Sequence, residues 1–266
     1  MTARLAPCDF VLIHGAWHGG WCWDAVRARL EAAGHRVHTP TLPGLAERAG
    51  ELTSALGLAD HIASVIAFIE AAQLRDIVLV GHSYGGMVIT GVADALAARI
   101  AQLVYLDAAV PRDGESMVSY GAPRPAEAIA ASIAGLQPLA PDGIAMQPLP
   151  PEALGIAPGH PAHAVLAARM TPHPIKTWLD PIALPNDGGG PRDLPRTYLH
   201  CTAPVLEASQ FPYIARLAAA DPDWRYGEIA TGHEAMLTAP DQVARHLLDT
   251  LAGLRHDGAI IRGEHA

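Results

Sequence analysis

The sequence predicts an α/β fold built on one mostly parallel sheet, and three observations lead to this prediction. Six short apolar runs typical of strands lie at residues 9–14, 35–39, 77–80, 103–106, 196–201 and 225–229. Stretches with helical periodicity alternate with most of them, at residues 23–33, 58–72, 87–98, 212–220 and 238–251. The chain has 266 residues, half of them hydrophobic, which suffices for one large core. Such alternation gives right-handed crossovers and a six-stranded sheet flanked by helices.

The individual elements follow from local patterns. The first run ends in a loop rich in Gly and aromatic residues, and the next helix is stopped by Gly34. Residues 40–56 hold two prolines and two glycines and are expected to form a loop. In the helix that follows, one face carries the apolar residues Ile62, Val65, Ile66 and Ile69. The last helix is expected to begin near Thr238, whose hydroxyl can cap it.

The alternation is interrupted between residues 110 and 195. This part has many prolines, few strand-like runs and weakly amphipathic Ala-rich pieces at residues 126–133 and 162–170. We therefore predict that residues 1–109 and 196–266 form the core, and that residues 110–195 form an inserted, mainly helical lid.

Composition restricts the partners. A formal net charge of −9 and the lack of a basic cluster argue against nucleic acid and anionic membranes. Three cysteines (Cys8, Cys22 and Cys201) suit reduced thiols better than a disulfide framework, and the apolar run within residues 1–13 is too short for a signal peptide. We expect a cytoplasmic protein without membrane spans. The sequence leaves its oligomeric state open, a homodimer included.

Residues 81–85 read G-H-S-Y-G and match the pattern G-x-S-x-G. The match matters because it follows a buried strand-like run and precedes an apolar helix, which is the strand–turn–helix setting that the pattern requires. Ser83 would then stand at the carboxyl edge of the sheet, where ligands of such sheets bind. The alternative is a Gly-rich turn with an incidental serine.

A serine hydroxyl needs a base to remove its proton and an acid to orient that base. The chain has 14 histidines, so position must select among them. His233 follows the last strand-like run and lies just before the final helix, which makes it the candidate general base; a surface histidine in a loop is the alternative. The order serine, acid, histidine is one of the known triad orders.

The sequence resembles the α/β-hydrolase superfamily, closest to the branch of plant methylesterases, hydroxynitrile lyases and related bacterial esterases. The resemblance rests on H-G-A-W-H-G-G-W-C-W at residues 14–23, G-H-S-Y-G-G at 81–86, Y-L-H-C-T at 198–202 and G-H-E-A-M-L at 232–237. It implies the α/β-hydrolase fold and an oxyanion hole formed by the backbone N–H groups of Ala16 and Tyr84. The expected substrate-pocket residues are Gly15, Trp17, His18 and His82.

The acid departs from the plant pattern. There an Asp follows the strand that here ends at Cys201-Thr202, but this chain continues with Ala203, and the nearest carboxylate is Glu207. Other members of the superfamily place the acid after the strand that follows the nucleophile helix, which here ends at Asp107. We predict that Asp107 is the acid, with Glu207 as the alternative; Asp107 as a strand cap that anchors the insertion is the non-catalytic interpretation.

These residues predict a serine esterase that acts on a small to medium hydrophobic ester through an acyl-enzyme, with no cofactor, no metal and no charged clamp. A C–C hydrolase or a lactonase would use the same triad. A hydroxynitrile lyase is disfavoured, because the lyases that the chain resembles carry Thr in place of Gly15 and Lys in place of Glu234. A non-enzymatic ligand receptor of the same fold is the alternative from another class.

Overall fold

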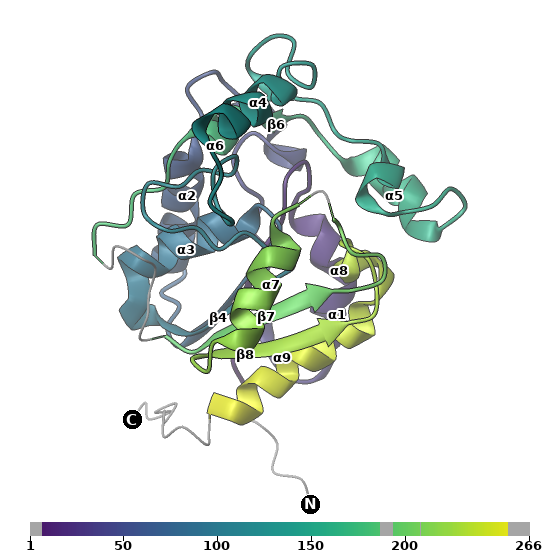
Figure 1. Cartoon of the computed structure of the whole chain (residues 1–266). Coiled ribbons are helices and arrows are strands. Elements are labelled where there is room, and N and C mark those ends of the chain that lie inside the picture. The colour runs from purple at the N-terminus through teal and green to yellow at the C-terminus, as the bar shows by residue number, and fades with distance from the viewer. Residues whose placement is uncertain (1–6, 187–193, 208, 255–266) are drawn as a thin grey trace, which may run out of the picture.

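Six parallel strands form one sheet in the computed structural model, which describes residues 7–186, 194–207 and 209–254. Their order across the sheet is β2-β1-β3-β4-β7-β8 (Figure 1). The strands are β1 Asp9–Ile13, β2 Arg36–His38, β3 Ile77–His82, β4 Ile100–Leu106, β7 Arg196–Cys201 and β8 Trp224–Ile229. Each of them contains or overlaps a predicted run, and the predicted six-stranded parallel sheet is confirmed.

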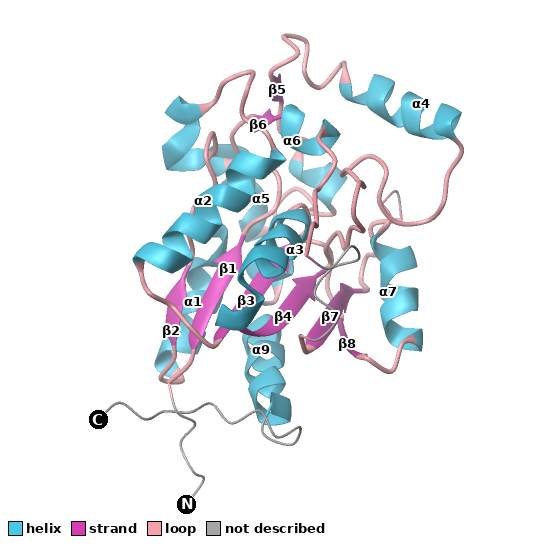
Figure 2. Ribbon diagram, turned by 90° about the vertical axis from the view of Figure 1, so that its left-hand side faces the viewer, coloured by secondary structure: helices cyan, strands magenta, loops and turns pink. Residues whose placement is uncertain are grey.

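Helices cover both faces of the sheet, as Figure 2 shows. Along β1 and β3, Val11 and Leu79 point to a core shared with α2 Leu58–Ala71, α3 Gly85–Leu96 and α7 Phe211–Ala220. The alternate residues Leu12 and Val78 point to a second core beneath α1 Asp24–Ala32 and α9 Pro240–Leu254. Because successive side chains of a strand face opposite ways, strands buried on both faces are expected to be apolar, and β1 and β3 are so apart from Asp9 and His82 at their ends.

The structure contains short helices in regions that the sequence predicted as loops, and it begins the final helix at a different residue. The predicted loop 40–56 contains the 3-10 helix Ala46–Glu51, and further 3-10 turns lie at Gly20–Trp23 and Ala97–Arg99. The predicted cap of the final helix is wrong: Thr238 is the last residue of a separate short helix, α8 Ala235–Thr238, and its hydroxyl donates to the backbone oxygen of Glu234. No helix among the described residues is long and apolar enough to cross a membrane.

The chain between β4 and β7 lies on the side of the strand arrowheads in Figure 2. We call residues 110–186 the β4–β7 segment. It holds α4 Ala126–Leu136, β5 Ala145–Met146, the 3-10 helix Pro151–Leu154, α5 Pro161–Arg169, β6 His173–Pro174 and α6 Lys176–Leu179. β5 and β6 pair antiparallel. Residues 187–193 of the predicted insertion lie outside the described residues, and its role as a lid stays a prediction.

Candidate active site

Ser83 occupies a tight turn between β3 and α3. Its φ of +55° lies in the left-handed region, which costs a residue with a side chain roughly 1 kcal/mol or more. The turn is held because the backbone oxygen of Ser83 accepts hydrogen bonds from Gly86 N at 3.1 Å and Ala109 N at 3.0 Å. A Cβ at Gly81 would lie 2.7 Å from the backbone oxygen of Gly85, so glycine is needed where strand and helix cross. The backbone therefore presents Ser83 at the sheet edge under strain.

His233 and Asp107 are brought together at the same edge. Nδ1 of His233 lies 2.7 Å from Oδ2 of Asp107, and the two residues are 4% and 1% exposed. The other carboxylate oxygen accepts from the backbone N–H of Cys201 at 3.3 Å. Asp107 also has a left-handed backbone, with φ of +43°, which aspartate tolerates better than most residues. An acid bonded to Nδ1 fixes the tautomer in which Nε2 is free to take a proton.

Glu207 lies elsewhere. It is exposed and lines a separate surface cavity together with His200 and Glu228. The ring of Phe211 stacks on the His233 ring, with a centroid distance of 5.1 Å and an angle of 11° between the planes. The geometry thus pairs His233 with Asp107 and leaves Glu207 in solvent.

The backbone near Ser83 offers two hydrogen-bond donors. Within the described ranges, neither Ala16 N–H nor Tyr84 N–H donates to a protein acceptor. Gly15 brings the first loop close, because a Cβ there would lie 2.9 Å from Cβ of Ser83. Free N–H groups beside a nucleophile are what an oxyanion needs. The same contact leaves little room for the threonine that the lyases carry in place of Gly15.

Ser83 and His233 line one cavity of about 470 Å³. Its other walls are mainly apolar and aromatic and include Trp17, Met117, Tyr120, Leu149, Trp178 and Phe211. Among the described residues that line it, Arg124 is the only Asp, Glu, Lys or Arg. Most of these walls come from the β4–β7 segment, so the chemistry and the cavity shape are supplied by different parts of the chain.

The residues predicted for the substrate pocket divide between two neighbouring spaces, both of which Ser83 and His233 also line. Trp17 lines the large cavity, but Gly15, His18 and His82 line a neighbouring space of about 10 Å³, which is too small for a substrate. The physical reason is that both imidazoles are turned inward to protein partners. Burial holds the pKa of His82 well below its usual value, and its Nε2–H donates to the backbone oxygen of His233 at 3.0 Å.

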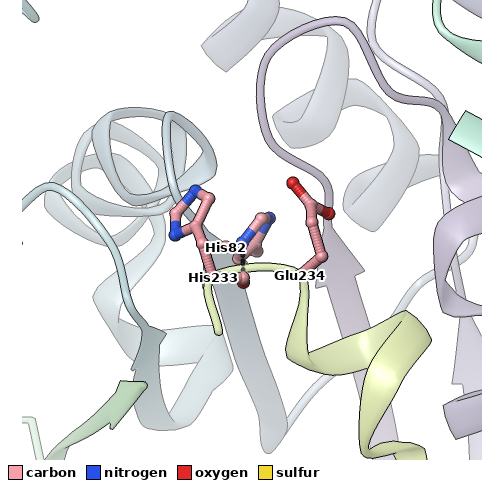
Figure 3. Close-up of side chains that lie close together, drawn as sticks. All are labelled: His82, His233 and Glu234. Carbon is pink, nitrogen blue, oxygen red and sulfur yellow. Dashed lines mark hydrogen bonds between the residues drawn. The ribbon is translucent and has the colours of Figure 1, made fainter. Parts of the chain in front are cut away.

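Figure 3 shows His82 between His233 and Glu234. One ligand atom from each of the three lies within 4.8 Å of the others, a spacing that a metal ion can use. Two of the three side chains are paired with other residues, however, whereas Nδ1 of His82 has no hydrogen-bond partner among the described residues. Nδ1 of His233 bonds to Asp107, and Glu234 pairs with His18 at 3.1 Å. Sequence reasoning noted Glu234 only as a difference from the lyases, although its position next to His233 placed it at the site.

A family model described as alpha/beta hydrolase family matches residues 10–246. The chain belongs to this family. A carbendazim hydrolyzing esterase from Nocardioides sp. is 41% identical over 241 residues, which cover 90% of this chain and 98% of the relative. A pyrethroid hydrolase from Sphingobium wenxiniae is 38% identical over 118 residues, or 43% of this chain and 42% of the relative.

A solved structure confirms the fold. An extracellular alpha/beta-hydrolase from a Paenibacillus species is similar with a TM-score of 0.71 and 24% identity, over 91% of this chain and 98% of that one. This likeness shows the fold, and the family model with the 41% identical relative confirms the family that the sequence motifs resemble.

Proposed function

We propose that this protein is a serine-dependent carboxylic ester hydrolase that works through an acyl-enzyme on Ser83. The observation that carries the proposal is the 2.7 Å contact between His233 Nδ1 and Asp107 Oδ2, beside a cavity that Ser83 and His233 share. The relatives named as a carbendazim hydrolyzing esterase and a pyrethroid hydrolase support the same reaction class.

In the first half of the reaction, Ser83 Oγ attacks the ester carbonyl while His233 Nε2 takes its proton. The carbonyl oxygen becomes an oxyanion and is stabilised by the N–H groups of Ala16 and Tyr84. His233 then gives the proton to the departing alkoxide, which leaves as an alcohol. In the second half, a water loses its proton to His233 and attacks the acyl-enzyme; His233 then returns that proton to Ser83 Oγ, which releases the acid and restores both residues. Asp107 stabilises the imidazolium formed in each half.

The cavity favours a small to medium hydrophobic, preferably aromatic, ester. About 470 Å³ is at the lower end of the range for small-molecule sites. Two buried donor nitrogens of its lining residues, Arg124 Nε and Trp178 Nε1, have no hydrogen-bond partner within the described part of the chain. A substrate with a hydrogen-bond acceptor distant from the scissile carbonyl would suit them. The sequence analysis expected no charged clamp in the site, and Arg124 is a charged residue that it did not assign there.

We propose that the β4–β7 segment, which supplies most of the cavity walls, acts as the lid of this cavity.

The alternatives differ in what supports them. The lyase reading is not favoured, since Glu234 stands where the lyases have lysine and would repel a departing cyanide. C–C hydrolysis and lactone opening use the same residues and differ only in substrate. A receptor would release little product.

We further propose a cytoplasmic protein without nucleic-acid partners, on the basis of the net charge of −9 and the three free buried thiols.

Ser83→Ala is the decisive variant. A fluorophosphonate probe should add to Ser83 in the natural chain, and the variant should lose both labelling and turnover of aryl esters, the latter by several powers of ten. Ser209→Ala is the matched control, because Ser209 also lines the cavity but its hydroxyl donates to the backbone oxygen of Leu206 at 2.7 Å. Labelling should survive that change. Labelling that persists in Ser83→Ala would refute the proposal, as would cleavage of mandelonitrile at the rate of the best ester.

A further inference from the structure

A buried ion pair joins the two loops that flank Ser83. His18 lies in the loop after β1, and Glu234 directly follows His233. Nε2 of His18 is 3.1 Å from Oε2 of Glu234, and the two side chains are 2% and 1% exposed. A charge this deeply buried is tolerated only with a partner. Each of these two charges therefore depends on the other.

Hydrogen bonding determines the protonation of His18. Its Nδ1 lies 2.6 Å from the backbone oxygen of Ala16, and only a protonated nitrogen can donate to a carbonyl. Nε2 lies 3.1 Å from the Glu234 carboxylate, although the angle is not that of a good hydrogen bond, and the nearby negative charge favours a proton there as well. Burial by itself lowers the pKa of His18, but the Glu234 carboxylate outweighs burial and raises it. Burial likewise would raise the pKa of Glu234, which the neighbouring His18 holds below its usual value. The pair is an imidazolium and a carboxylate.

The imidazolium holds a residue that the catalytic mechanism uses. It anchors the carbonyl of Ala16, whose N–H is one of the two proposed oxyanion donors. The next residue, Trp17, has φ of +65°, a left-handed conformation that is strained for a bulky residue. Strained backbone persists only where its surroundings enforce it. The loop that aims the Ala16 N–H therefore depends on outside contacts, and His18 provides one of them.

The carboxylate belongs to the loop of the general base. Glu234 is covalently next to His233, and the backbone oxygen of His233 accepts the hydrogen bond from His82. The contacts from Ala16 through His18 to Glu234 thus connect the loop of the oxyanion donor with the loop of the general base. Proton transfer and oxyanion stabilisation both require placement to within a fraction of an ångström.

We propose that the His18–Glu234 ion pair is a positioning pair, which fixes the Ala16 oxyanion donor relative to His233. The proposal rests on the ester hydrolysis proposed above. It gives Glu234 a task that the lysine of the lyases could not perform, since a lysine cannot pair with an imidazolium. Neither residue touches the substrate in this assignment; both act through Ala16 and His233.

The test combines kinetics with two different substitutions. Glu234→Gln keeps the shape but removes the charge, and His18→Asn keeps an N–H group near the place of Nδ1 but cannot reach Glu234. Each should lower kcat on an aryl ester by roughly 10- to 100-fold while KM stays within about threefold, because a mis-aimed oxyanion donor costs less than a deleted one. The rate of Ser83 labelling by a fluorophosphonate should fall in parallel. The double variant should be no more than about threefold worse than the worse single variant, because the two act as a unit.

Asp9→Asn is the matched control. Asp9 is also a buried carboxylate, 6% exposed, and pairs with Arg36 and His38, but it lies at the opposite end of β1 from the site. It should lower the melting temperature and leave kcat within about twofold, which separates stability from positioning. A Glu234→Gln protein that keeps kcat and labelling within about twofold would overturn the proposal, as would single losses that multiply in the double variant. Failure of the proposed function has a different signature, namely ester turnover that survives Ser83→Ala.

Discussion

The floor and the roof of the cavity are built in different ways. The floor consists of Ser83, Asp107 and His233, which follow the ends of strands. The backbone N–H groups of Ser83 and Asp107 donate to the sheet, and His233 is held by the side chains of Asp107 and His82. The roof comes mainly from the β4–β7 segment, where side-chain packing dominates and where three exposed large apolar residues lie: Ile133, Val165 and Leu179. The difference indicates that the reaction depends on a rigid floor, whereas the choice of substrate depends on a roof that can vary without disturbing it.

The largest effect is expected from the floor. Asp107→Asn should lower kcat at least about a hundredfold, since loss of the acid in serine proteases costs about 10⁴-fold through the wrong tautomer of the base. KM should change little, because Asp107 does not line the cavity. Steady-state kinetics on an aryl ester measure both constants.

The fold must be checked in the same preparation. Asp107 also accepts from Cys201 N, so near-ultraviolet circular dichroism should show that the link between β4 and β7 has survived the change to Asn. A folded Asp107→Asn protein with wild-type kcat would contradict the assignment of the acid and with it the rigid floor.

A smaller effect is expected from the roof. Arg124 donates to Ser132 Oγ at 3.1 Å and to the backbone oxygen of Val118, and it is the one Lys or Arg among the described residues of the cavity walls. Arg124→Met should leave kcat for a neutral ester within about threefold. It should lower by about tenfold the preference for an ester whose acyl chain ends in a carboxylate, because a charge-assisted hydrogen bond contributes roughly 1.5–3 kcal/mol and part of it is screened.

The measurement is the ratio of kcat/KM for a matched ester pair, with and without the terminal carboxylate. Arg124→Lys is the control that keeps the charge and should retain most of the preference. Equal losses in kcat/KM for both esters would mean that Arg124 only stabilises the packing of the roof. The result would contradict the view that the roof determines the choice of substrate.

The same division explains what the sequence could predict. The strands and Ser83 are encoded locally, in apolar runs and in one strand–turn–helix motif, and the structure has them at the predicted places. The inward turn of His18 and His82 was missed because it depends on Glu234 and His233, which lie more than two hundred and about one hundred and fifty residues further along the chain. Arg124 was missed because the β4–β7 segment carries no motif that fixes its fold. The orientation of His18 and His82 and the place of Arg124 in the cavity wall both depend on contacts between residues far apart in the sequence, which local patterns do not reveal.

The smallest effect is expected at Glu207, the carboxylate that the sequence offered as the alternative acid. β4 and β7 are neighbouring parallel strands, so a residue after either strand end can in principle approach the base. Burial separates the two: Asp107 is 1% exposed and bonded to His233, whereas Glu207 is exposed in a cavity shared with His200 and Glu228. An exposed charge is screened by water and salt and contributes little at a distance. Glu207→Gln should therefore change kcat by less than about twofold, measured beside Asp107→Asn on the same ester and at the same pH. Equal losses in the two variants would mean that the acid reaches His233 from the end of β7 during turnover, and that the floor is less rigid than the hydrogen bonds of Asp107 indicate.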